Sequence, residues 1–82
     1  MPNFELTLFY REGCHLCDQM LAELSPYINL ANVNLQRIDI DEHPVWLSRY
    51  NALIPVLHVN DEPICKYYLD KQRLEAYLTE LE

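Results

Sequence analysis

The sequence predicts a small α/β protein with the element order β-α-β-α-β-β-α, in which a mixed four-stranded sheet carries helices on both faces. Strand-like runs alternate with amphipathic segments along the first part of the chain, as they do in parallel β-α-β units. The last two strand-like runs are separated by Asn60-Asp61, a pair that favours a tight hairpin. The chain has 82 residues, 50% of them hydrophobic, so residues 1–82 are expected to form one domain.

The first strand and the first helix are predicted on either side of the chain's only glycine, Gly13. Residues 4–10, FELTLFY, alternate apolar and polar side chains and then become wholly apolar, as a strand entering a covered sheet does. The apolar positions that follow have helical spacing and are Leu16, Cys17, Met20, Leu21 and Leu24. Ser25-Pro26 is expected to interrupt this helix, because the residue before a proline is disfavoured in helical geometry; at most a further short turn would begin there.

The second strand and the second helix are predicted in the middle of the chain. Residues 34–40, NLQRIDI, alternate weakly and lie where a parallel partner of the first strand is expected. Pro44 follows acidic residues and marks the start of a helix. Trp46, Leu47 and Tyr50 form one face of that helix.

The C-terminal part is predicted to be an antiparallel hairpin followed by a helix. Residues 56–59 and 63–67 are the two strands, and Asp70 is a suitable N-cap for the helix. The apolar face of this helix consists of Leu74, Tyr77, Leu78 and Leu81.

Charge and composition argue against several classes of function. The formal net charge of −7 disfavours a nucleic-acid partner, because such binding depends on clustered Lys and Arg. No apolar run is long enough to cross a bilayer, and the N-terminal residues do not resemble a signal peptide, so no membrane partner is expected. Three cysteines are too few for a secreted disulfide scaffold, which indicates a reducing compartment, and we expect a cytoplasmic monomer.

Two of the cysteines, Cys14 and Cys17, lie at the predicted start of the first helix. The unpaired N–H groups of a helix start favour a thiolate over a thiol, so Cys14 is the candidate nucleophile. Arg11 and a protonated His15 would add to this effect. Cys17 follows one turn later on the same face, where it can attack a mixed disulfide formed at Cys14. The pattern indicates thiol–disulfide chemistry.

Two other interpretations of the cysteine pair remain open. Buried cysteines also occur simply as small apolar core residues. A structural zinc site usually needs a second Cys or His pair at short spacing, and His58 with Cys65 is a poor match. We therefore expect no metal.

The segment LFYREGCHLC, the Ile54-Pro55 step before a strand-like run and the element order together resemble the thioredoxin superfamily, and specifically a small glutaredoxin-like protein. The resemblance implies a thioredoxin-like fold and reduction of protein or glutathione mixed disulfides, with no required cofactor and with glutathione as one reductant. It implies that Cys14 is the nucleophile and Cys17 the resolving thiol. It also implies that Pro55 is cis and lies against the pair, and that the backbone of Ile54 pairs with an extended substrate.

Two segments depart from the glutaredoxin pattern. His15-Leu16 stands between the cysteines where glutaredoxins commonly have Pro-Tyr. Residues 64–67, ICKY, stand where glutaredoxins usually carry a Gly-Gly pair, which lets the backbone approach glutathione. Glutathione binding is therefore open, although Lys66 can meet a substrate carboxylate. A thioredoxin-fold binding module without turnover remains the alternative function.

Cys65 is a candidate third thiol. Its predicted strand returns toward Pro55, so a second resolving reaction is one interpretation and a small buried core residue is the other. The candidate substrate-binding residues are Arg11, His15, Ile54, Pro55 and Lys66.

Overall fold

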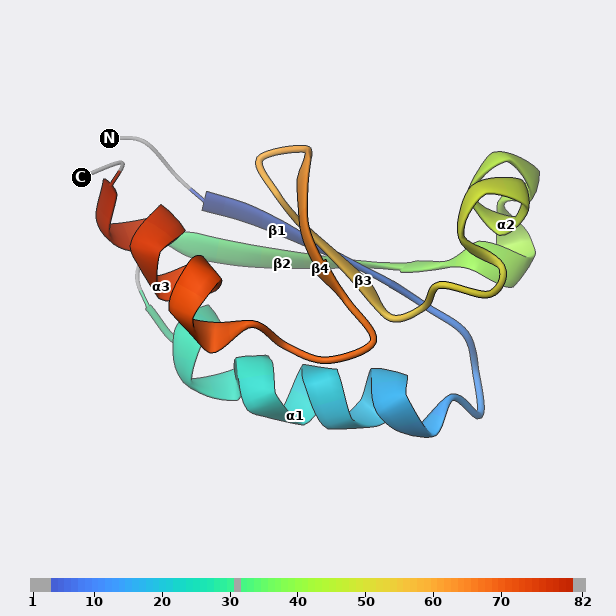
Figure 1. Ribbon diagram of the computed structural model, residues 1–82, viewed down its shortest axis with the longest axis horizontal. Helices are drawn as coiled ribbons and strands as arrows, with labels where there is room; N and C mark the ends of the chain where they lie inside the picture. Colours follow the sequence, from blue (N-terminus) through green and yellow to red (C-terminus); the bar gives the residue numbers. More distant parts are fainter. Residues whose placement is uncertain (1–3, 31, 81–82) are drawn as a thin grey trace.

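The sheet is the centre of the structure, and its strands lie in the order β2-β1-β3-β4 (Figure 1). The computed structural model describes residues 4–30 and 32–80. The strands are β1 (Phe4–Tyr10), β2 (Val33–Asp39), β3 (Val56–Val59) and β4 (Glu62–Lys66). β1 is parallel to β2 and antiparallel to β3, and β3 and β4 form an antiparallel hairpin. The predicted mixed sheet is confirmed.

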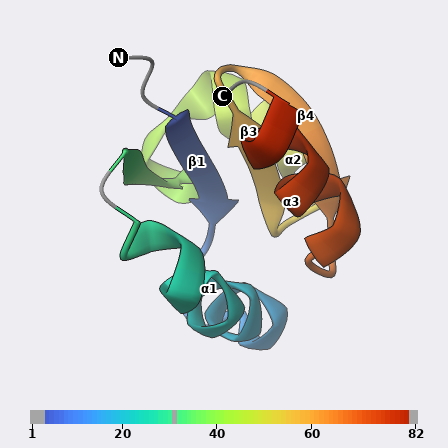
Figure 2. The same cartoon turned by 90° about the vertical axis from the view of Figure 1, so that its left-hand side faces the viewer.

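The helices lie on both faces of this sheet, as predicted. In the described residues they are α1 (His15–Ile28), the short 3-10 helix η1 (Ile40–Glu42), α2 (Pro44–Tyr50) and α3 (Lys71–Glu80). Successive side chains of β1 point to opposite faces: Leu8 packs in the core with α1 and α3, and Phe9 packs in the core with α2. Figures 1 and 2 show α1 running alongside the sheet, with α2 and α3 at opposite ends. In the part of the chain that the structure describes, no helix is both long and apolar enough to cross a membrane.

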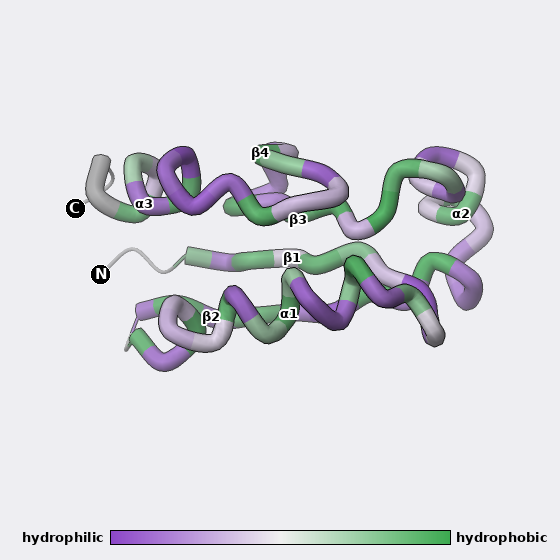
Figure 3. Tube along the Cα trace, turned by 60° about the horizontal axis from the view of Figure 1, so that its bottom comes forward, coloured by the Kyte–Doolittle hydropathy of each residue, from purple (hydrophilic) through white to green (hydrophobic). Residues whose placement is uncertain are grey.

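The larger core lies between the sheet and the helices α1 and α3. Its buried members include Phe4, Leu6, Leu8, Met20, Leu24, Leu74 and Leu78. Figure 3 shows the underlying pattern: apolar residues dominate β1, whereas they alternate with polar ones along α1. Burying one stripe of α1 in this way fixes the helix, and with it the turn that precedes it, against the sheet.

A smaller core beneath α2 is built from aromatic rings. The centroid of the Phe9 ring lies 4.4 Å from that of Trp46 and 5.1 Å from that of Tyr50. His58 on β3 completes the cluster, with its ring centroid 4.6 Å from that of Phe9. The Nε2 atom of His58 lies 2.8 Å from the Tyr50 hydroxyl oxygen, a hydrogen bond that satisfies an imidazole only 6% exposed.

The buried imidazole gives a testable pH dependence of stability. Burial lowers the pKa of His58 below its ordinary value of 6.5; the charge of Asp61 opposes this shift and that of Arg49 adds to it. As pH falls, His58 therefore binds a proton in the unfolded chain before it does so in the folded protein. We expect the contribution of His58 to stability to be complete above pH 6.5 and to be lost as the pH falls below that value.

Urea denaturation across this pH range measures the effect, with His58→Gln as the comparison. Glutamine can accept a hydrogen bond from the Tyr50 hydroxyl and does not titrate. The variant should lose less stability on acidification than the wild type. The same loss in both proteins would contradict the prediction.

The hairpin turn and the start of α3 also follow the sequence. Asn60 and Asp61 have φ angles of 50° and 70°, the left-handed values expected of this turn. The backbone N–H of Asn60 donates to the Glu5 carbonyl, and its side-chain oxygen accepts from the Glu5 N–H, both at 2.9 Å. Asp70 caps α3, because its Oδ1 accepts from the Arg73 N–H at 3.0 Å.

The end of α1 differs from the prediction. The helix continues through Pro26 to Ile28, so the predicted interruption at Ser25-Pro26 is wrong. Tyr27 and Ile28 pack against the larger core, and this tertiary contact holds the last turn helical despite the proline.

Two strands, β2 and β4, each begin and end one residue earlier than predicted. β2 begins at Val33 and ends at Asp39, and Ile40 belongs to η1, where its buried side chain joins the core beneath α2. β4 ends at Lys66 because Tyr67 has a φ of 67°, which no strand contains. Leu81, predicted on the apolar face of α3, lies outside the described residues.

Candidate active site

The turn after β1 holds Cys14 at the entrance of α1. Gly13 has a φ of 79°, a left-handed conformation that glycine adopts without a side-chain penalty. Cys14 is extended, with φ −88° and ψ 110°, and is the N-cap of α1. Its N–H donates to the Arg11 carbonyl at 3.2 Å, and its carbonyl accepts from the Asp18 N–H at 3.1 Å. Turn and helix therefore fix Cys14 from both sides.

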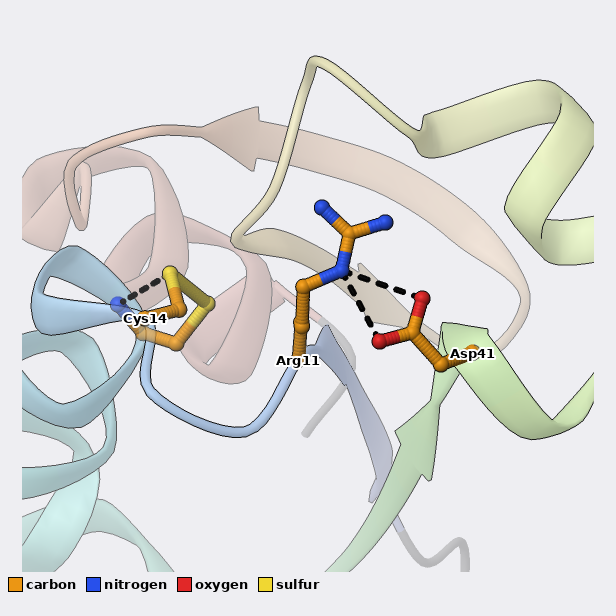
Figure 4. The surroundings of a disulfide bond; sticks show 4 residues. Arg11, Cys14 and Asp41 are labelled. Atoms are coloured by element: carbon orange, nitrogen blue, oxygen red, sulfur yellow. Dashed lines mark hydrogen bonds and ion pairs between the residues drawn. A yellow bond between two sulfur atoms is a disulfide. The ribbon is translucent and has the colours of Figure 1, made fainter.

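A disulfide joins Cys14 to Cys17 (Figure 4). Their Cα atoms are 5.2 Å apart, within the usual range for disulfides. The N-cap conformation of Cys14 makes this separation available, because the residue stands outside the regular helix that begins at His15. The pair predicted from the sequence is thus brought together.

The two sulfur atoms differ in their surroundings. Cys17 is 2% exposed and part of the core, whereas Cys14 is half-buried. The Sγ atom of Cys14 accepts a hydrogen bond from the Cys17 N–H at 3.2 Å. In the reduced protein, this N–H and the positive end of the α1 dipole favour the thiolate of Cys14. Cys14 is therefore more accessible from solution than Cys17.

Ile54 and Pro55 lie at the same end of the sheet as the disulfide. β1 and β3 are antiparallel with Phe9 opposite Val56, so β3 begins where β1 ends. Figures 1 and 4 show the chain that enters β3 passing beside the start of α1. The Ile54–Pro55 peptide bond is cis, as the resemblance implies. The buried Pro55 accepts a hydrogen bond at its carbonyl from the Tyr67 N–H at 2.8 Å.

Arg11, directly after β1, forms side-chain hydrogen bonds with one residue of η1 and one residue that follows α2. Its Nε atom lies 3.0 Å from each carboxylate oxygen of Asp41 in η1, and Figure 4 shows the side chain extending toward that carboxylate. Its Nη2 donates to Oδ1 of Asn51, which follows α2, at 2.7 Å. The hydrogen bond to Asp41 raises the pKa of Arg11, so the guanidinium stays charged.

The other two side chains predicted to bind a substrate through polar groups are exposed. His15 lies on the first turn of α1, next to Cys14. Lys66 ends β4 opposite Val56, and its Nζ lies 5.7 Å from the centroid of the Tyr67 ring. Their substrate-binding roles remain predictions, as do those of Arg11, Ile54 and Pro55.

Cys65 lies opposite Leu57 of β3 and packs, half-buried, against the larger core. Burial raises the pKa of its thiol, and a hydrogen bond from the backbone of Asp70 opposes this shift. Less thiolate is then present at neutral pH, which makes Cys65 a slower nucleophile than an ordinary thiol. A reaction with the cysteine pair stays a prediction.

His58 and Cys65, the second pair on which a zinc site would depend, lie apart in the structure. His58 lies in the aromatic core beneath α2, whereas Cys65 packs against the core on the other face of the sheet. Within residues 4–30 and 32–80, no group of three His, Cys, Asp or Glu side chains is placed to hold a metal ion.

Comparison with known families places the chain. The family model described as glutaredoxin-like domain (DUF836) matches residues 5–79, which includes the cysteine pair and the Ile54-Pro55 step. The chain belongs to this glutaredoxin-like family. The resemblance inferred from LFYREGCHLC and the element order is thereby confirmed.

Solved structures agree with this assignment. A Nitrosomonas europaea protein solved by NMR superimposes with a TM-score of 0.81 and 34% identity, over 94% of this chain and 93% of the other. An X-ray structure of an X. campestris protein superimposes with a TM-score of 0.71 and 32% sequence identity, over 92% of this chain and 96% of the other. Mitochondrial thioredoxin 3 of Saccharomyces cerevisiae gives 0.67 at 20% identity, over 98% of this chain and 80% of the other. The glutaredoxin-like protein therefore has a thioredoxin-like fold.

Three residues near the site of the glutaredoxin-like protein could not be identified from the sequence as part of it. Asp41 and Asn51 bind Arg11, and their places in the sequence carry no signal of this contact. Tyr67, with its left-handed backbone, donates from its hydroxyl to the Ala52 carbonyl at 3.0 Å. The left-handed backbone of Tyr67 did have a signal in the sequence. Tyr67 lies in the segment where glutaredoxins carry Gly-Gly, and glycine is the residue that best tolerates a positive φ.

Proposed function

We propose that this glutaredoxin-like protein is a thiol–disulfide oxidoreductase that reduces protein disulfides or glutathione mixed disulfides. The observation that carries the proposal is the unequal placement of the two sulfur atoms. Cys14 is a half-exposed N-cap whose Sγ accepts a backbone N–H, and Cys17 is 2% exposed within the core. This arrangement suits Cys14 as the attacking thiolate and Cys17 as the thiol that resolves the product.

Reduction begins when the Cys14 thiolate attacks one sulfur of the substrate disulfide. A Cys14–substrate disulfide forms, and the second substrate sulfur leaves as a thiolate that takes up a proton. Cys17, after losing its proton, attacks the Cys14 sulfur, so that the Cys14–Cys17 disulfide forms and the remaining substrate sulfur is released. The protein dithiol has then given an electron pair to the substrate. Glutathione or a dithiol protein serves as the reductant that restores both thiols.

Substrate binding is proposed on the backbone of Ile54. The Tyr67 N–H already occupies the carbonyl of Pro55, so Ile54 is the next position at which an extended segment can pair with this chain. Such a segment would run past the start of α1 with its sulfur at Cys14. His15 and Lys66 are the exposed residues proposed to contact charged groups of the substrate.

A redox titration tests the proposal. Wild type and Cys17→Ser are equilibrated in glutathione buffers, free thiols are trapped by alkylation, and each species is identified by mass spectrometry. We expect a reversible Cys14–Cys17 disulfide in the wild type. In Cys17→Ser we expect a glutathione adduct on Cys14, because the proposed resolving thiol is absent. Cys65→Ser is the matched control and should behave as the wild type.

The side chains of Cys65, Lys66 and Tyr67 favour a second candidate, a binding module that turns over no disulfide. They occupy the segment where a glutaredoxin backbone approaches glutathione, and the Tyr67 ring is anchored there by its hydrogen bond to Ala52. Absence of both redox species across the titration would contradict the oxidoreductase and leave this module as the function.

A further inference from the structure

The ion pair between Arg11 and Asp41 bears on which disulfides the protein accepts. Arg11 is close to the reacting sulfur in the chain, and its carbonyl accepts the Cys14 N–H at 3.2 Å. The Nε atom of its guanidinium, however, is 3.0 Å from both carboxylate oxygens of Asp41. The two side chains remain 33% and 46% exposed, so the pair lies at the surface next to the disulfide rather than in the core (Figure 4).

We propose that Asp41 is a specificity-determining residue that cancels the charge of Arg11 and so disfavours small disulfides bearing carboxylates, such as oxidised glutathione, relative to neutral segments of protein substrates. This inference rests on the proposed oxidoreductase function. It assigns a role to Asp41, which touches Arg11 and not the reacting sulfur atoms.

Charge complementarity supports the proposal. A substrate carboxylate that approached Arg11 would meet the Asp41 carboxylate at the same guanidinium, and like charges at one site repel. Asp39 is a second acidic neighbour whose charge acts on Arg11. The chain as a whole carries a formal charge of −7, which offers an anion no compensating attraction at longer range.

Asn51 helps to fix the direction in which the Arg11 guanidinium points. Its Oδ1 accepts from Nη2 of Arg11 at 2.7 Å, so the guanidinium is held between η1 and the segment after α2. A substrate anion could recruit Arg11 only by competing with Asp41. Because an exposed ion pair is weak, removing Asp41 should release the guanidinium without unfolding the protein.

The experiment compares the kcat/KM of two small disulfides, oxidised glutathione and 2-hydroxyethyl disulfide, which has no carboxylate. Wild type, Asp41→Asn, Arg11→Gln and the double variant are assayed with a dithiol as electron source. We expect Asp41→Asn to raise the ratio of the glutathione value to the hydroxyethyl value about two- to fivefold, the range typical of one exposed ion pair. The gain should vanish in the double variant and shrink as salt is added.

Asp61→Asn is the matched control, because it removes one negative charge at the hairpin turn, far along β3 from the disulfide, and asparagine tolerates the left-handed φ of 70°. It should leave the ratio unchanged. If Asp41→Asn changes kcat/KM for both disulfides by the same factor, the ion pair only supports the local backbone. That result would overturn the inference and leave the oxidoreductase standing. A wild type that reduces neither small disulfide overturns this inference, and the redox titration of Cys14 and Cys17 then decides whether the oxidoreductase stands.

Discussion

Replacing Phe9 with alanine is expected to lower the free energy of unfolding by about 3–5 kcal/mol, the range for truncating a buried phenylalanine. Phe9 is 1% exposed, and its ring contacts those of Trp46, Tyr50 and His58. Truncation therefore leaves a cavity at the centre of the core that attaches α2 to the sheet. Since the stability of a domain is only about 5–15 kcal/mol, the variant should be close to unfolding at room temperature.

Urea denaturation followed by the fluorescence of Trp46, the only tryptophan of the chain, measures this loss where it arises. Val45→Ala is the control, because Val45 also belongs to α2 but is 71% exposed. Its effect should stay within about 0.5 kcal/mol. Similar losses in the two variants would show that α2 is held by its own helical structure rather than by the Phe9 ring.

The strands and their succession along the chain could be predicted because their signals are local. The apolar run of β1 and the turn residues Asn60-Asp61 depend only on neighbouring side chains and backbone preferences, and the structure confirms both. The course of α1 past Pro26 could not be predicted in this way. It depends on Tyr27 and Ile28 packing against a core assembled from distant strands, a tertiary contact that outweighs a local preference.

The site shows the same division. The position of Cys14 at the start of α1 follows from the spacing of the cysteines and from Gly13, and is found as expected. Arg11 was predicted beside the thiolate from its place in the sequence, but its charge is paired with Asp41, thirty residues further along the chain. Whether a surface charge is available to a substrate depends on such a partner, and no periodicity in the sequence reports it.

Replacing Pro26 with alanine is expected to raise the free energy of unfolding by about 2 kcal/mol. Pro26 is exposed, so little packing is lost when its ring is removed. It lies inside α1, has no N–H to donate to the Ala22 carbonyl, and its ring crowds that carbonyl. Alanine restores the N–H donor and, as the better helix former, stabilises the folded protein by about 3 kcal/mol. It also gives the unfolded chain more conformational freedom, which offsets about 1 kcal/mol of that stabilisation.

Pro44→Ala is the matched control, because Pro44 is also an exposed proline in a helix. It is the first residue of α2, where an N–H would have no intrahelical partner, so alanine gains no hydrogen bond and should lower stability by up to about 1 kcal/mol. Urea denaturation of both variants measures the difference. Opposite signs are expected because the same substitution restores a hydrogen bond at one position and only loosens the unfolded chain at the other. A loss of stability in Pro26→Ala would mean that the last turn of α1 is held by Tyr27 and Ile28 in a geometry that the proline ring itself supports.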